Sequence, residues 1–443
     1  MSKTLVNLHQ IRGAPVSVLD YGADPSASAA VNTAAIAAAY AYAKSINGCL
    51  VFPAGNYKFT NLTFDGASTI VKGIGKVTLT CEGTSGAAIT IGNMAGMEYF
   101  VMKDFHIVGN ALCSPGIQVG INTGYSSIVL ARFILENLSV VGFSKASAIG
   151  AYFIYAIEGM IRGCTFESCG GFGIGVQAWA TTLNFDTCNF RTSTTCGAYT
   201  ETGCIGILFT NCVFESNYGP GVYIHGGTNI YFKNCWWENN NRTASGTAKF
   251  NYSVCGDLGT DGIHSFKDCW MTGGAGTVGD FYFYNMGDVE LDGITTYIDA
   301  AQYFLFAEAT TYNRMIWRQV RNVMYRNVGT LSNIKGVDVA YFGLESFADR
   351  TIANLGNIAL PDPHGKITVL DITHGTLGVW QTDPFTTATH LLSGDPALCN
   401  VVGGAGFISI NYAAGAFRLT NETGVQVDFT IAKEMPTVAG YVL

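Results

Sequence analysis

The five-residue segment CTFES at residues 164–168 recurs as CNFRT at 188–192, CVFES at 212–216, CWWEN at 235–239 and CWMTG at 269–273. A second strand-like segment precedes each later copy, as LNFDT from Leu183, ILFTN from Ile207, IYFKN from Ile230 and HSFKD from His264. The cysteines are separated by 24, 24, 23 and 34 residues. The column extends less regularly back through Leu138 and Phe105 and forward through Ile294 and Val323.

A repeat of this length predicts a solenoid or a propeller. A propeller blade needs about 40 residues or more, whereas about 24 residues suit one three-strand turn of a parallel β-helix. Each repeat contains strands and turns without a helix. The sequence therefore predicts an all-β chain folded as a right-handed parallel β-helix, in which each turn is one rung.

Alternation along a strand sorts the side chains, because successive residues point to opposite faces. If the repeated cysteines point inward, so do the large apolar residues two positions later: Phe166, Phe190, Phe214, Trp237 and Met271. A third strand repeats at Phe172, Cys196 and Pro220. The predicted core is a set of stacked like residues, with the column cysteines as small apolar core groups rather than disulfides.

Composition excludes several classes of function. The net charge of −8 and the absence of a Lys/Arg cluster argue against nucleic acid as a ligand. No stretch approaches about 18 apolar residues, so membrane insertion is not expected, and the N-terminal MSKTLVNLHQIRG lacks the apolar core of a signal peptide. Paired C-x2-C motifs and calcium-loop spacing are absent, so no metal or other cofactor is expected.

Residues 14–59 contain VLDYGADP, an Ala-rich stretch and GCLVFPAGNYKF. This pattern resembles the opening of the pectate-lyase-like β-helices, especially bacteriophage tailspikes and capsule depolymerases. The chain departs from the family at Ala29-Ala30-Val31-Asn32-Thr33, where a Gly-x-x-Asp-Asp-Thr run is common. The resemblance implies a homotrimer on a virion tail, made in the host cytoplasm and acting at the bacterial cell surface. It also implies a bacterial surface polysaccharide as ligand.

The expected organisation has three parts: an N-terminal arm at residues 1–20, a β-helix at 21–345 and a β-rich C-terminal domain at 346–443. The resemblance implies that the arm would join other phage tail proteins. A capping helix is expected near residues 32–44, with Asn32 or a nearby serine as its N-cap and an apolar stripe of Ile36, Tyr40 and Ala43. GKITVLDITHG, FISINYAAGAFRLTN and VQVDFTIA predict an antiparallel module, for which the resemblance implies trimerisation or carbohydrate binding.

The neighbours of the inward cysteines point outward and nominate a site. One strand face would carry three carboxylates, an arginine and a row of aromatic side chains: Glu167, Arg191, Glu215, Glu238, Trp236, Trp270 and Tyr297. Adjacent rungs lie about 4.8 Å apart and alternate rungs about 9.6 Å, which brackets the carboxyl separations of retaining and inverting glycosidases. The tryptophans could stack on sugar rings. A solvated strand face is the competing interpretation.

Two other candidate sites follow. The long rung at residues 241–262 holds Asp257 and Asp261, either of which could be a second carboxylate beside Glu238. Tyr223 and His225 could instead serve β-elimination from a uronate, or could be ordinary turn residues. The predicted function is glycosidic hydrolysis of a bacterial polysaccharide, and the alternatives are a polysaccharide lyase or a receptor-binding spike without activity.

Overall fold

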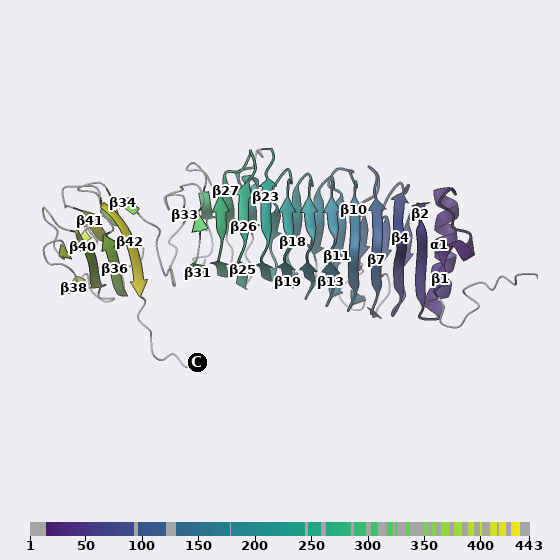
Figure 1. Cartoon of the computed structure of the whole chain (residues 1–443), viewed down its shortest axis with the longest axis horizontal. Coiled ribbons are helices and arrows are strands. Elements are labelled where there is room, and N and C mark those ends of the chain that lie inside the picture. The colour runs from purple at the N-terminus through teal and green to yellow at the C-terminus, as the bar shows by residue number, and fades with distance from the viewer. Residues whose placement is uncertain are drawn as a thin grey trace, which may run out of the picture.

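The computed structural model describes residues 15–92, 96–120, 130–177, 179–243, 247–257, 263–284 and 288–297, and beyond these the backbone of individual strands. Strands stack in parallel along the long axis of the molecule (Figure 1). This arrangement confirms the predicted right-handed parallel β-helix. Within the described residues, no helix is long and apolar enough to cross a membrane.

Three strand faces run along the β-helix. The phenylalanine face consists of β13 (Met160–Arg162), β16 (Asn184–Asp186), β19 (Ile205–Thr210), β22 (Thr228–Lys233), β25 (Ile263–Lys267) and β28 (Asp288–Asp292). The cysteine face, whose strands follow the repeated cysteines, consists of β14 (Thr165–Glu167), β17 (Asn189–Arg191), β20 (Val213–Glu215), β23 (Trp236–Asn240), β26 (Trp270–Gly273) and β29 (Thr295–Tyr297).

The tyrosine face belongs to a separate 11-stranded sheet. Its central strands are β11 (Ile149–Ile154), β15 (Phe172–Gln177), β18 (Cys196–Glu201), β21 (Val222–His225), β24 (Tyr252–Asp257) and β27 (Gly279–Tyr284). Towards the N-terminus the first two faces merge, because β4 (Ile70–Cys81), β7 (Val101–Val108) and β10 (Ile134–Val141) run through both. β10 accordingly pairs with β13 along one half and with β14 along the other.

The core is built from the predicted ladders. Phe209 stacks between Phe185 and Phe232, with ring centroids 4.8 Å apart on each side. Phe214 stacks on Phe190 at 5.0 Å and on Trp237 at 4.9 Å. The cysteines of the column are buried free thiols: Cys164, Cys188, Cys212, Cys235 and Cys269. Most of the other described cysteines are also buried free thiols. The thiols of the column donate to backbone carbonyls, for example Cys212 Sγ to Phe185 O at 3.3 Å.

Helix α1 (Ala29–Ser45) lies at the N-terminal end of the β-helix (Figure 1). It buries the predicted stripe of Ile36, Tyr40 and Ala43. The helix begins three residues before the predicted start, because Ser28 is the N-cap and its side chain accepts from the backbone N–H of Val31. Asn32 is instead a buried residue inside the helix, where its Oδ1 accepts from the backbone N–H of Asp24 at 2.8 Å.

The ends of the chain refine the expected boundaries. β1 (Val16–Ser17) pairs in parallel with β2 (Cys49–Phe59), although residues 16–17 fall within the segment 1–20 that was predicted as the arm. Strand direction changes after β33 (Ile334–Gly336): β36 (Gly365–Asp371) pairs antiparallel with β37 (Thr376–Thr382) and β42 (Val427–Glu434). The domain limits at residues 345 and 346 remain a prediction.

Candidate active site

Four outward residues of the cysteine face form a row, as expected, which we call the glutamate ladder: Glu167, Arg191, Glu215 and Glu238. Glu167 is the register partner of Arg191, Arg191 of Glu215, and Glu215 of Glu238. The guanidinium of Arg191 donates to Glu167 at 3.0 Å. Glu215 and Glu238 therefore occupy neighbouring rungs, about 4.8 Å apart along the β-helix. The ladder is open to solvent, with Glu238 exposed and the other three side chains half-buried.

An aromatic stack continues along the same face. The rings of Trp236 and Trp270 lie 4.8 Å apart and nearly parallel, with an interplanar angle of 5°. Tyr297 extends the stack from Trp270 at 5.3 Å. Trp236 ends the stack next to Val213 of the preceding rung and is 38% exposed, so part of its apolar ring is open to solvent.

The structure separates Asp257 from Glu238. Residues 241–262 were expected to form an inserted loop beside Glu238, but they contain strand β24 of the tyrosine face. Asp257 therefore has His225 as its register partner, not a residue of the glutamate ladder. Asp261 lies outside the described residues.

Asp257 is the centre of a compact cluster on the tyrosine face, which we call the Asp257 cluster: Tyr223, His225, Lys249 and Asp257. His225 Nδ1 lies 2.6 Å from Asp257 Oδ1. The phenol of Tyr223 lies 3.0 Å from both carboxylate oxygens and 3.0 Å from His225 Nδ1. Lys249 donates to Asp257 Oδ2 and lies 3.2 Å from the Tyr223 oxygen. The structure thus joins three side chains that the sequence had nominated for different mechanisms.

The cluster is assembled from two strands and a turn. Tyr223 and His225 project from the same side of β21, because they are two residues apart. Asp257 ends β24 on the next rung, and Lys249 comes from the 3₁₀ helix η3 (Ala248–Asn251) immediately before β24. The Lys249 ammonium also lies 5.2 Å from the ring centroids of Tyr223 and Phe250. Two aromatic rings therefore hold the lysine over the site.

Burial decides the electrostatics of the Asp257 cluster. Desolvation, followed by the nearby Asp257 carboxylate, raises the pKa of Tyr223 well above its usual range. The phenol therefore stays protonated and can act as a proton donor. The side chain of Asp257 is only 8% exposed and faces three hydrogen-bonding or cationic partners. Such a carboxylate orients its partners and compensates their charge, as expected for a buried acid that is fully paired.

Further residues of this face were missed from the sequence. Tyr199 stacks on His225 with ring centroids 6.1 Å apart, and Glu201 is the register partner of His225 on the other side from Asp257. Burial and then Glu201 raise the pKa of Tyr199, and burial raises the pKa of Tyr152 to about 12. The alignment of CGAYTE at 196–201 with PGVYIH at 220–225 was a usable signal. No sequence signal pointed to Lys249, because it lies in a turn outside the repeat.

His225 is oriented for proton transfer. Its Nδ1 faces the Asp257 carboxylate, and no described residue hydrogen-bonds to its Nε2. A histidine held this way by a carboxylate presents its second nitrogen to a substrate as a base or acid. In the described part of the chain, no three His, Cys, Asp or Glu residues form a group that could hold a metal ion.

Comparisons with known proteins agree with this architecture. Residues 87–264 match the family model of the right handed beta helix region. No curated protein sequence matches the chain.

Solved structures are similar in fold at low sequence identity. A DFA-IIIase from Arthrobacter chlorophenolicus A6, in complex with DFA-III, has a TM-score of 0.52 and 11% identity, over 74% of this chain and 88% of that chain. The N-terminal fragment of gene product 12 of bacteriophage Phi29 has a TM-score of 0.50 and 12% identity, over 72% of this chain and 63% of that chain. A tailspike protein of Acinetobacter baumannii bacteriophage Fri1, a capsular polysaccharide depolymerase, has a TM-score of 0.43 and 10% identity, over 97% and 88%. The family model, which covers residues 87–264, and the two structures at or above 0.50 agree with the right-handed parallel β-helix fold.

Proposed function

We propose that the chain is a polysaccharide-cleaving enzyme that acts by β-elimination at a uronate residue, with the Asp257 cluster as its active site. The observation that carries this proposal is the His225–Asp257 contact of 2.6 Å, with the protonated phenol of Tyr223 3.0 Å from both. A base and an acid thus stand on the same side of a bound sugar. Elimination needs this pair and no attacking water.

The proposed step is balanced by these groups. His225 Nε2 removes the proton from the carbon next to the uronate carboxyl group. The electrons of that C–H bond form a carbon–carbon double bond, and the bond to the glycosidic oxygen breaks. Tyr223 protonates the departing oxygen, while Lys249 offers positive charge to the uronate carboxylate and Asp257 stabilises the imidazolium.

The exposed charge of the Asp257 cluster differs in sign from the net charge of the chain. The net charge of −8 disfavours anionic ligands at long range. At the Asp257 cluster, however, Lys249 and His225 are about a third exposed while the carboxylate beneath them is buried. An anionic sugar therefore meets the cationic side of the cluster first.

Hydrolysis by the glutamate ladder is the second candidate. The in-register pair of Glu215 and Glu238 stands beside the exposed face of Trp236, where a sugar ring can stack. A retaining or inverting mechanism would use these two carboxyl groups, with Glu167 and Arg191 positioning the substrate.

For the biological setting we propose a trimeric phage tailspike that acts on capsule, exopolysaccharide or O-antigen at the bacterial surface. Support comes from the β-helix fold and from the resemblance of residues 14–59 to tailspikes. The virion location, the homotrimer and attachment to other tail proteins through the N-terminal arm are parts of this proposal. A spike that binds polysaccharide without cleaving it is the alternative.

The deciding experiment incubates the full chain with a panel of uronate-containing and neutral bacterial surface polysaccharides. Ultraviolet absorbance of the unsaturated uronate and the number of new reducing ends are followed together. Elimination raises both signals, hydrolysis raises reducing ends alone, and binding without cleavage raises neither. His225→Gln should abolish the absorbance change, whereas Glu215→Gln should leave it intact. New reducing ends without an absorbance change, lost in Glu215→Gln and retained in His225→Gln, would move the active site to the glutamate ladder.

A further inference from the structure

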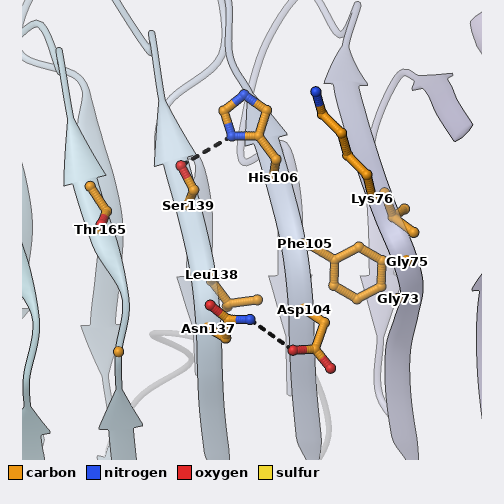
Figure 2. A pocket seen from close by; sticks show the side chains of 12 residues that line it. Gly73, Gly75, Lys76, Asp104, Phe105, His106, Asn137, Leu138, Ser139 and Thr165 are labelled. Atoms are coloured by element: carbon orange, nitrogen blue, oxygen red, sulfur yellow. Dashed lines mark hydrogen bonds between the residues drawn. The ribbon is translucent and has the colours of Figure 1, made fainter. Parts of the chain in front are cut away.

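A hollow of about 470 Å³ lies at the N-terminal end of the cysteine face, far along the chain from the Asp257 cluster. Figure 2 shows its polar side chains projecting from four neighbouring strands, β4, β7, β10 and β14. It lies at the corner where the phenylalanine and cysteine faces meet. We call it the first hollow.

A bulge in β4 forms one wall of the first hollow. Between Lys72 and Thr78, β4 has three more residues than the paired stretch of β7 between Lys103 and His106. Gly73 makes the bulge possible, because a Cβ there would lie 2.2 Å from the carbonyl oxygen of Asp104. The wall carries Lys76, whose side chain extends beside His106 in Figure 2.

The floor of the first hollow presents polar atoms that the protein leaves unused. His106 Nδ1 lies 3.0 Å from Ser139 Oγ, and Asn137 donates to one oxygen of Asp104 at 2.9 Å. No described residue hydrogen-bonds to His106 Nε2 or to the other oxygen of Asp104. Both contacts orient a side chain while keeping one of its polar atoms available to a ligand.

A second hollow, of about 350 Å³, repeats the first further along the same corner. In the first, the corner positions just before the inward column are Asp104, Asn137 and Gly163, and in the second they are Asn234, Asp268 and Gly293. All six have a left-handed backbone, with φ between 52° and 69°, and so do the corner residues of the two rungs between the hollows, Thr187 and Asn211. This conformation suits Asn, Asp and Gly.

The correspondence extends to the strand positions two residues after each corner residue. His106, Ser139 and Thr165 line the first hollow where Trp236, Trp270 and Thr295 line the second. The second hollow spans three rungs, and the first spans the three matching rungs together with the bulge of β4 on a fourth. Both have ring or hydroxyl groups on one side and amide or carboxylate groups on the other. Five rung steps separate corresponding positions, which is about 24 Å.

We infer that the two hollows are the ends of one saccharide-binding groove, which anchors the polymer on a face separate from the Asp257 cluster. The second hollow offers the apolar ring of Trp236 beside Asp268, and the first offers Asp104, His106 and Ser139. A sugar ring packs its C–H groups against an aromatic side chain and hydrogen-bonds its hydroxyl groups to polar side chains, and the two hollows together offer both. The inference takes only the ligand class, a bacterial surface polysaccharide, from the proposed function.

The inference predicts a dependence on ligand length. A fragment that spans both hollows gains from the second contact without a second loss of translational freedom. Fragments longer than about 24 Å should therefore bind more tightly than fragments that fill one hollow. A single isolated sugar-binding pocket would show no such dependence.

The test uses the full chain carrying His225→Gln, so that the ligand is not cleaved at the proposed active site. Size-graded fragments of bacterial capsular polysaccharides and O-antigens are immobilised on an array and binding is measured. Adding Trp236→Ala or His106→Ala should weaken binding of long fragments about tenfold each. Tyr231→Ala, an aromatic residue on the phenylalanine face, is the matched control and should leave binding unchanged.

The inference is overturned if no fragment binds, if both groove variants bind as the parent does, or if affinity is independent of length. Its failure is distinguishable from failure of the proposed function. Turnover of short soluble fragments is measured with the native chain and with Tyr231→Ala, whereas binding of long fragments is measured with the His225→Gln chain. Absence of turnover together with intact, length-dependent binding would reject the elimination site and leave the groove standing.

Discussion

His225 and Asp257 occupy facing positions on adjacent rungs, and the imidazole Nδ1 lies 2.6 Å from the carboxylate Oδ1. The contact depends on strand register, since a shift of one residue would turn one of the two side chains to the opposite face. A parallel β-helix repeats its register rung after rung. The fold therefore supplies the precise placement that a histidine base requires.

Asp257→Asn should lower turnover by at least about a hundredfold while the β-helix stays folded, because an amide neither stabilises the imidazolium nor enforces the same tautomer of His225. The measurement is the rate of unsaturated uronate formation, with circular dichroism to establish folding. Asp186→Asn on the phenylalanine face is a suitable control. Unchanged turnover in Asp257→Asn would remove this cluster from the mechanism.

The β-helix was predictable because its core is repetitive. The cysteine and phenylalanine columns recur at nearly constant spacing, and alternation then assigns each neighbour to the inside or the outside. The register of Glu215 with Glu238 and of Trp236 with Trp270 followed from that pattern alone. Helix α1 was predicted with a late start, since Ser28 and Asn32 are both acceptable N-caps and only the fold decides between them.

The Asp257 cluster was less predictable for physical reasons. The rung that contains β24 is about ten residues longer than its neighbours, so the strand does not fall at the repeat spacing. Asp257 was therefore predicted to lie in a loop beside Glu238. Lys249 reaches the site from a short 3₁₀ helix that has no counterpart in neighbouring rungs. A column of buried asparagines was also missed: Asn217 and Asn240 donate to the Phe190 and Phe214 carbonyls at 3.1 Å and 2.7 Å.

Asp280 should make stability depend on pH. Complete burial raises its pKa to about 7, although a hydrogen bond from Thr296 opposes the shift. Between about pH 4 and 7 the folded chain therefore binds more protons at this site than the unfolded chain, whose carboxyl has an ordinary pKa of about 3.9. The contribution of Asp280 to stability is complete below pH 4 and is lost as the pH rises through 7. Asp280→Asn should remove this loss, which thermal melts across the range would measure.

The variant must be compared with the native chain, because His264 changes stability with pH in the direction opposite to Asp280. Burial lowers the pKa of His264 to about 4, so its contribution to stability is present above about pH 6.5 and lost as the pH falls through 4. The two effects partly cancel in the native melts. The difference in melting temperature, Asp280→Asn minus native, should increase from pH 4 to pH 8. A difference independent of pH would contradict the assignment.

The Arg191–Glu167 pair should contribute little to stability. Arg191 Nη2 lies 3.0 Å from Glu167 Oε2, but the two side chains are 43% and 30% exposed. Exposed ion pairs contribute about 0 to 1 kcal/mol to the free energy of unfolding. Arg191→Met should therefore change the free energy of unfolding by less than about 1 kcal/mol. Chemical denaturation checks this value. A larger loss would show that Arg191 supports the fold rather than a ligand surface.

Phe209→Ala should destabilise the β-helix strongly, because the ring stacks between Phe185 and Phe232 at 4.8 Å on both sides and also packs edge-on against Phe190. Removing a buried phenylalanine costs about 3 to 5 kcal/mol, and here the loss of two stacked contacts places the variant at the upper end. Val31→Ala, at an exposed position of α1, is the control and should change stability by less than about 0.5 kcal/mol. Since each rung contacts only its neighbours, the loss should be local. Hydrogen exchange should accelerate in β16, β19 and β22 before it does in β2 and β4, and uniform acceleration along the chain would contradict this rung-by-rung account.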